Sequence, residues 1–116
     1  PSEISGGMKK RVAIARAISM NPKYLFCDEP NSGLDPKTSI VIDNLIKEIT
    51  EEFQTTTVIN THDMNSVTEI GEKIVFIYKG KKWWEGNYHD LKSADNQELN
   101  DFVFATKVMK HMKASL

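Results

Sequence analysis

The spacing of apolar residues along the chain predicts helices and strands in alternation. In some segments apolar side chains recur three or four positions apart, as they do on one face of a helix. We expect helices in four segments, residues 8–20, 37–53, 65–70 and 97–112. Elsewhere, short runs of β-branched and aromatic residues predict strands. We expect strands in four segments, residues 24–27, 56–60, 73–78 and 82–85.

The first helix and the first strand are both expected to be mostly buried. Alanine and aliphatic residues dominate residues 8–20, and the run from Tyr24 to Cys27 is apolar throughout. Such continuous apolar runs are typical of elements covered on both sides, and for a strand they favour a parallel sheet. Asn21 should end the helix, because the residue before a proline avoids the helical conformation.

The order of these elements predicts an α/β fold. Strands that alternate with helices favour a parallel sheet with right-handed crossovers. The last two strands should instead form a hairpin, because residues 79–81 (Lys-Gly-Lys) predict a tight turn between them. Ligands of parallel sheets lie outside the carboxyl ends of the strands. Asp28, Glu29 and His62 all follow such ends, so they are the first candidates for a site.

Composition and charge narrow the class of protein. The 116 residues are 40% hydrophobic and 27% charged, which is typical of a folded domain. The net charge is −1, so no global field steers the chain to nucleic acid or anionic lipid, and no nucleic-acid partner is expected. The single cysteine, Cys27, excludes an internal disulfide and a cysteine-based zinc site.

Membrane and targeting signals are not apparent in the sequence. No apolar stretch approaches about 18 residues, so no bilayer span is expected. The first residues show neither the pattern of a signal peptide nor an initiator methionine. We therefore expect this chain to be a piece of a longer polypeptide.

Two carboxylates directly follow the first strand. A carboxylate at that place can hold Mg²⁺, usually through water, and Asp28 is the candidate. A second carboxylate can orient and deprotonate an attacking water, and Glu29 is the candidate for that role. The ordinary structural alternative is a polar strand end that leads into a loop. His62 follows the next strand, and it could donate a hydrogen bond to a terminal phosphate.

Glycines at the start of the first helix suggest a phosphate contact. A helix N-terminus presents unpaired N–H groups and the positive end of a dipole, and glycine lets a ligand approach the backbone. Ser5, Gly6 and Gly7 fit this description, although an ordinary capped helix would show the same residues. Farther along, Asp35 and Pro36 have the pattern of an N-cap and a first helical position.

In this order and spacing, the motifs resemble the C-terminal part of an ATP-binding cassette (ABC) ATPase. Residues 4–8 look like the signature motif, and residues 24–28 look like the Walker B strand, with Glu29 at the position of the catalytic glutamate. Residues 32–35 look like the D-loop, and His62 matches the switch histidine. Four motifs in the family's order make chance agreement very improbable.

The resemblance implies a fold, an activity and its cofactors. The implied fold is α/β, a partial P-loop NTPase (RecA-like) parallel sheet with flanking helices, a C-terminal hairpin and a tail helix. The implied activity is hydrolysis of ATP in the presence of Mg²⁺. Glu29 would act as the general base, His62 would help to position the water at the phosphate, and Asp28 would hold Mg²⁺ through water.

A second ATPase subunit is also implied, because family members pack head to tail with two ATP molecules between them. Ser5, Gly6, Gly7 and Met8 would contact the ATP held by the partner of a homodimer, and Asp35 would also belong to the nucleotide-binding set. ATP would favour the closed dimer because it contacts both faces in that state only.

The resemblance also indicates what this stretch of sequence does not contain. The Walker A loop, which cradles the phosphates, lies N-terminal to the signature motif in the family, and no GxxxxGK[ST] pattern occurs here. The 116 residues alone are therefore expected to be inactive. We expect residues 1–86 to be the C-terminal part of the ATPase domain and residues 87–116 to be a helical tail.

The predicted biological role is that of an ABC transporter ATPase on the cytoplasmic face of the inner (cell) membrane, docked to a permease. Met8 in place of the usual glutamine, followed by residues 9–18, is similar to ATPases of lipid transporters that work with mammalian-cell-entry (MCE) proteins. Lipid transport with an MCE-type partner is therefore the expected subfamily. The alternative is a non-transport ABC ATPase of DNA repair or chromosome maintenance.

Overall fold

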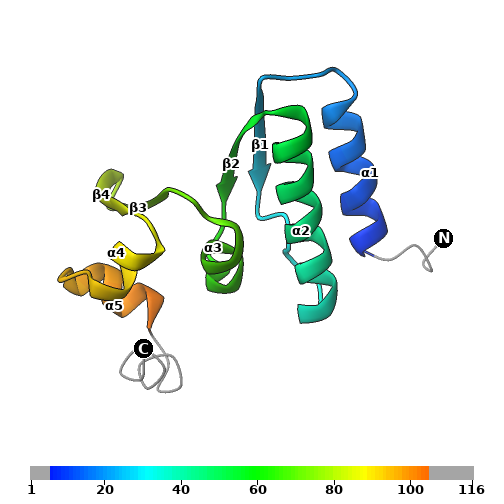
Figure 1. Ribbon diagram of the computed structural model, residues 1–116. Coiled ribbons are helices and arrows are strands. Elements are labelled where there is room, and N and C mark those ends of the chain that lie inside the picture. Colours follow the sequence, from blue (N-terminus) through cyan, green and yellow to red (C-terminus); the bar gives the residue numbers. More distant parts are fainter. Residues whose placement is uncertain (1–5, 105–116) are drawn as a thin grey trace. The chain divides into compact units, whose positions relative to one another are not determined.

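The computed structural model of this chain describes residues 6–104, and the chain divides into two units after Ile70 (Figure 1). The elements of the first unit are α1 (Gly6–Ile18), β1 (Tyr24–Asp28), α2 (Pro36–Phe53), β2 (Thr56–Asn60) and α3 (Met64–Ile70). The elements of the second unit are β3 (Ile74–Tyr78), β4 (Lys81–Gly86), α4 (Tyr88–Ser93) and α5 (Gln97–Val103). The predicted boundary after residue 86, between the ATPase domain and the helical tail, differs from this division into units and stays a prediction.

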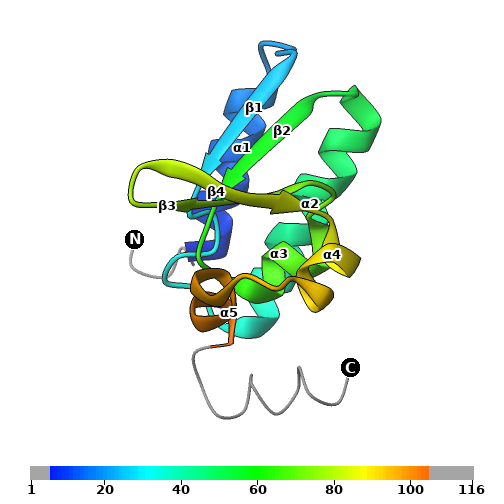
Figure 2. The ribbon, with the colours of Figure 1, turned by 90° about the vertical axis from the view of Figure 1, so that its left-hand side faces the viewer.

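The sheet of the first unit is a parallel pair, as the sequence predicts. Strands β1 and β2 run from Tyr24 opposite Thr56 to Asp28 opposite Asn60. Figure 2 shows the two strands in front of α1 and α2, so these helices cover one face of the pair. The carboxyl ends of both strands therefore lie at the same edge, where the candidate residues follow.

The core of the first unit lies between α1, α2 and the covered face of the sheet. Ile14 of α1 packs with Ile42 and Ile46 of α2, and the last two are 0% and 1% exposed. The sheet contributes Cys27 and Ile59, which are partly buried and stand opposite each other in the register. Fully burying an isoleucine side chain, as at Ile42 and Ile46, contributes roughly 1.5–3 kcal/mol, so this core holds the sheet against the helices.

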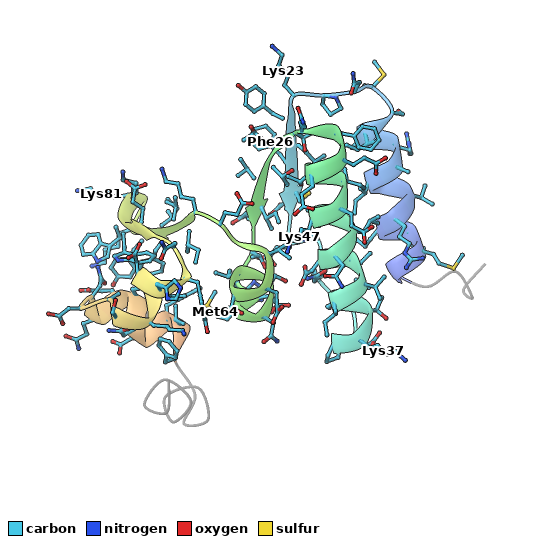
Figure 3. All side chains as sticks on the ribbon, in the orientation of Figure 1. Lys23, Phe26, Lys37, Lys47, Met64 and Lys81 are labelled. Carbon is cyan, nitrogen blue, oxygen red and sulfur yellow. The ribbon has the colours of Figure 1, made fainter. Side chains whose placement is uncertain are left out.

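The expectation that the first helix and strand are mostly buried is wrong for the part of the chain that the structure describes. Only Gly7 and Ile14 of α1 are buried. In β1, Leu25 is buried whereas Tyr24 and Phe26 are 62% and 73% exposed, and Phe26 points away from α2 (Figure 3). The physical reason is that, within the first unit, other elements pack against one side of α1 and of β1 only.

Helix α2 begins and ends at local signals. Asp35 is its N-cap, because the carboxylate accepts a hydrogen bond from the backbone N–H of Thr38, and Pro36 occupies the first turn. At the other end Gln54 adopts a left-handed conformation with φ 52°, and its N–H bonds back to the carbonyl of Thr50. The predicted capping role of Asp35 is confirmed.

The second unit contains the predicted hairpin. Strands β3 and β4 are antiparallel, and Lys79 and Gly80 form the turn with φ 51° and 73°, as a type I′ turn requires. Phe76 is buried and its ring lies 5.4 Å from that of Phe102, which attaches α5 to the hairpin.

The tail of the chain differs from the single helix predicted for residues 97–112. Helix α5 ends at Val103, and residues 105–112 lie outside the described part. The short helix α4 was not predicted. Its signal was a capping box, in which Asn87 and Asp90 each accept a hydrogen bond from the other's backbone N–H.

Candidate functional site

The structure brings the predicted acid and the predicted imidazole into contact. His62 Nδ1 lies 2.8 Å from Glu29 Oε1, although the two residues are 33 positions apart. The parallel register produces this contact, because Asp28 stands opposite Asn60 and the side-chain amide of Asn60 donates to Asp28 Oδ1 at 2.7 Å. One more pairing, from the backbone N–H of Glu29 to the carbonyl of Asn60 at 2.7 Å, extends the strands to the site.

The direction of the hydrogen bond between His62 and Glu29 depends on the tautomer of the ring. A carboxylate can only accept, so with Glu29 in the carboxylate form Nδ1 of His62 donates. The neutral ring then presents a lone pair at Nε2, whereas the imidazolium presents a second N–H. A phosphate needs a donor, so His62 contacts both Glu29 and a phosphate only when the ring carries two protons.

The backbone at Glu29 has an unusual conformation. Its φ is 46°, in the left-handed region, which costs a residue with a Cβ atom about 1–2 kcal/mol. The conformation is held from both sides, because Glu29 also accepts a hydrogen bond from the N–H of Ser32 at 3.0 Å. Strained residues that their surroundings hold in place are common at functional sites.

Thr61 is a neighbour of the pair that the sequence analysis did not single out. Its hydroxyl lies 3.5 Å from Glu29 Oε2, a long contact, and accepts a hydrogen bond from the backbone N–H of Asp63 at 2.9 Å. The signal available in the sequence was its place directly before His62 at the end of β2. Thr61 thereby links the acid to the start of α3.

The site is open to a ligand. The side chain of His62 is 79% exposed and that of Glu29 is 33% exposed. Asp28, the predicted Mg²⁺ residue, is exposed at the end of β1 and has a second carboxylate oxygen besides the one bonded to Asn60. No cluster of three metal-ligating side chains occurs among residues 6–104, so a cation here would take most of its ligands from phosphate and water.

The predicted glycine motif lies at the start of α1. Ser5 lies outside the described residues, whereas Gly6, Gly7 and Met8 form the first turn of α1. A Cβ atom at Gly6 would lie 2.8 Å from Leu34 Cδ2, so this glycine lets α1 approach the loop that precedes α2. The predicted nucleotide contact of these residues stays a prediction.

Asp35 has a clear structural role at the start of α2. The hydroxyl of Thr38 donates to its carboxylate, and together with the backbone N–H of Thr38 this lowers the pKa of Asp35 below its ordinary value. Its side chain is thus engaged in capping, and a role at a nucleotide stays a prediction. In β1, burial raises the pKa of the Cys27 thiol, in agreement with its packing against the core of the first unit.

Comparison with known proteins adds sequence relatives. The ABC transporter family model matches residues 1–32. Methionine import ATP-binding protein MetN 1 of Oceanobacillus iheyensis is 45% identical over 104 residues, which cover 89% of this chain and 31% of that protein. MetN 2 of Bacillus cereus is 35% identical over 116 residues, covering 100% of this chain and 34% of that protein. The chain thus spans about a third of the length of the curated relatives it matches.

Solved structures of similar proteins identify the fold. The ATP-binding cassette MJ0796, a dimer in a post-hydrolysis state bound to ADP and Pi, has a TM-score of 0.64 and 40% identity, covering 75% of this chain and 37% of that one. A nucleotide-free ATP-binding cassette from an ABC transporter has a TM-score of 0.77 and 26% identity, covering 86% and 40%. The fold is that of part of an ATP-binding cassette. The predicted fold class is therefore confirmed, and so is the general resemblance to an ABC ATPase.

The predicted subfamily, lipid transporters, is wrong. Lipid transporters with an MCE-type partner were expected from the sequence, whereas the relatives described above are methionine import ATP-binding proteins. Met8 and the ten residues after it carried that prediction, and such a short stretch weighs less than 104 aligned residues. The alternative of DNA repair or chromosome maintenance finds no support among these relatives either.

Proposed function

We propose that this chain is part of the ATP-hydrolysing subunit of an ABC transporter. The observation that carries the proposal is the 2.8 Å contact between Glu29 and His62 at the carboxyl edge of a parallel strand pair with the cassette fold. An acid next to an imidazole, both open to solvent, can orient and deprotonate a water beside a terminal phosphate.

In this proposal Glu29 takes the proton of the attacking water. Its Oε1 atom is engaged by His62, and Oε2 has a lone pair for that proton besides the long contact with Thr61. The left-handed backbone and the bond to Asn60 fix the direction of the acid, so little reorganisation is needed when the water reacts. His62, when doubly protonated, donates to the phosphate through Nε2.

The cofactors of the proposed activity are ATP and Mg²⁺. Asp28 is the residue of this chain that would hold the ion through water, and the bound ion would neutralise charge on the phosphates. The phosphate-binding loop would come from a part of the polypeptide that precedes these residues. The contribution of this chain is thus the acid, the imidazole and the residues that orient them.

A partner subunit, a permease and a location belong to the same proposal. MJ0796 was solved as a dimer, and we propose a homodimer here, in which Gly6, Gly7 and Met8 contact the nucleotide of the partner. No helix among residues 6–104 is long and apolar enough to cross a bilayer. We propose that a separate permease forms the membrane pathway and that this subunit lies on the cytoplasmic face, as an importer ATPase would.

Methionine is the transported molecule that the relatives favour. The specific support is that MetN 2 of Bacillus cereus aligns with every residue of this chain, the second unit included. The test is uptake of radiolabelled methionine by cells with and without the intact gene. Unchanged uptake would contradict methionine as the transported molecule, and it would not affect the ATPase proposal.

The ATPase proposal is tested with Glu29→Gln in the full-length protein. The amide cannot accept the proton of the water, so hydrolysis should fall by about 10²–10⁴-fold while ATP still binds. Turnover is measured as released phosphate, and binding with a fluorescent ATP analogue. The matched control is Glu51→Gln on α2, which removes an exposed carboxylate. Near-normal turnover in the Glu29 variant would contradict the proposal.

A further inference from the structure

A buried polar cluster joins the loop after Glu29 to the helix after His62. Asn31, Asp43 and Ser66 are 7%, 4% and 2% exposed. The side-chain amide of Asn31 donates to Asp43 Oδ1 at 2.6 Å and lies 2.7 Å from Ser66 Oγ. The hydroxyl of Ser66 lies 2.9 and 3.0 Å from the two oxygens of Asp43. Three elements thus meet at the carboxylate of Asp43, which lies on α2.

This cluster is costly to bury, so its presence needs an explanation. Asp43 forms no ion pair within the described residues, and only neutral donors compensate its carboxylate. The side-chain oxygen of Asn31 is buried and has no hydrogen-bond partner in that part of the chain. Buried polar atoms without partners are rare in folded proteins, and each calls for an explanation. The orientation of the Asn31 amide is therefore set by its two acceptors, Asp43 and Ser66.

The place of the cluster in the sequence relates it to the site. Asn31 lies two residues after Glu29, and the N–H of Leu34 bonds to its carbonyl at 3.1 Å within the same loop. Ser66 lies four residues after His62, in a helix whose start is tied to Thr61 through the backbone of Asp63. Asp43 therefore connects the segment that carries the acid to the segment that carries the imidazole by a second route, besides their direct contact.

We propose that Asp43, with Asn31 and Ser66, is a positioning residue that sets the separation of Glu29 and His62. The carboxylate of Asp43 fixes the loop from Asn31 and the first turns of α3 at one distance from α2. That distance in turn holds the acid and the imidazole within hydrogen-bond reach of each other. The inference rests on the proposed ATPase function, because separation of the pair matters only if the pair works on a bound nucleotide.

The first test replaces Asp43 in the full-length protein. Asp43→Leu removes the acceptor, so the Glu29–His62 contact should loosen and kcat should fall by about 10- to 100-fold, since catalysis is sensitive to misplacement on the scale of 1 Å. KM for ATP should stay within about twofold, because Asp43 is buried and is not among the residues proposed to contact the nucleotide. Asp43→Asn keeps an acceptor oxygen and should recover most of kcat. The exposed Glu51→Gln on the same helix is the control and should leave both constants unchanged.

A second variant separates positioning from simple stability. The triple variant Asn31→Leu, Asp43→Leu, Ser66→Ala removes the unpaired donors that the single change leaves, and apolar replacement of a whole polar cluster is often neutral for folding. Its midpoint of thermal unfolding should return toward that of the wild type while kcat stays low. A stable triple variant with wild-type kcat would overturn the proposal, and so would a loss of activity that appears in KM instead.

The outcomes also distinguish this inference from the proposed function. If Glu29→Gln stops hydrolysis and the Asp43 variants leave kcat intact, the positioning role alone fails. If the wild-type full-length protein hydrolyses no ATP, or Glu29→Gln turns over normally, the proposed function fails and the positioning role fails with it.

Discussion

The parallel pair β1–β2 joins segments that are separated by α2, whereas the antiparallel pair β3–β4 is closed by a turn at Lys79 and Gly80. The first pair depends on a shared core, in which Ile42 and Ile46 of α2 pack near Cys27 and Ile59. The second depends on neighbours in sequence. Among the described residues, only the parallel pair ends in the predicted acid and imidazole.

The difference shows why the candidate site lies where it does. Parallel strands end at the same edge, so side chains far apart in sequence meet there, as Glu29 and His62 do. In the hairpin, Lys73 and Lys82 instead form ion pairs with Glu85 across and along the strands, and these contacts suit stability rather than chemistry. Long-range pairing therefore forms the candidate site, and local pairing forms the hairpin of the second unit.

The 116-residue chain, studied by itself, offers a separate probe for each unit, so the comparison can be measured. Both tryptophans, Trp83 and Trp84, lie in β4, and their fluorescence reports unfolding of the second unit. The single cysteine, Cys27, lies half-buried in β1, and its rate of labelling reports opening of the first unit. A substitution in the first unit should therefore change the labelling rate of Cys27 alone, and a substitution in the second unit should change the tryptophan transition alone.

The largest effect on stability is expected from Ile42→Ala. Ile42 is 0% exposed in the core of the first unit, and such truncations cost about 2–5 kcal/mol. Labelling of Cys27 should become much faster at a given denaturant concentration, while the tryptophan transition stays in place. Ile40→Ala is the control on the same helix, because Ile40 is 56% exposed. Equal shifts of both signals would show that the two units unfold together and would break the comparison.

A smaller effect is expected from Gly80→Ala in the turn of the hairpin. Gly80 has φ 73°, and a Cβ atom in this left-handed conformation costs about 1–2 kcal/mol although no atom lies within 4 Å of it. The tryptophan transition should move to lower denaturant concentration with no change at Cys27. Gly33→Ala is the matched variant in the first unit, since Gly33 has φ 78° and equal open space. Gly33→Ala should instead make labelling of Cys27 faster. If Gly33→Ala moved the tryptophan transition and Gly80→Ala moved the labelling of Cys27, the assignment of each signal to its unit would be refuted.

The smallest effect is expected from the ion pairs of the hairpin. Hydrogen bonds from Lys82 and Lys73, and their charges, lower the pKa of Glu85 from 4.5 to about 2. A lowered pKa in the folded state stabilises the fold at pH values above the unfolded pKa, and this contribution is lost as the pH falls toward 2. The tryptophan transition of Glu85→Gln should thus differ from the wild type at pH 7, with the gap closing between about pH 4.5 and pH 2. A gap that persists at low pH, or that salt does not reduce, would contradict this account.

The elements of this chain were largely predictable, because their signals are local. Asp35 and Pro36 mark the start of α2, and the turn at Lys79 and Gly80 marks the hairpin. The helix α4 was missed although the capping box of Asn87 and Asp90 was present. The predicted burial of α1 and β1 failed for a different reason, since an apolar run cannot reveal how many sides have a packing partner in these residues.

The residues of the candidate site were predictable from the sequence, whereas the buried residues that hold them in place were not. Asp28, Glu29 and His62 were expected at one edge, and the structure places Glu29 and His62 in contact. Asn31, Asp43 and Ser66 carry no motif, and each has an ordinary local explanation as a loop, helix or turn residue. Their common burial depends on the crossing of α2 with the segments on either side of it.

By itself the sequence determined the order of the elements, their caps and turns, and the residue types that follow each strand, because these depend on neighbours within a few positions. Only the tertiary structure decided that the imidazole of His62 meets the acid of Glu29 and that Asp43 is buried with two neutral donors. These contacts join residues 12 to 35 positions apart, and their geometry follows from the packing of whole elements.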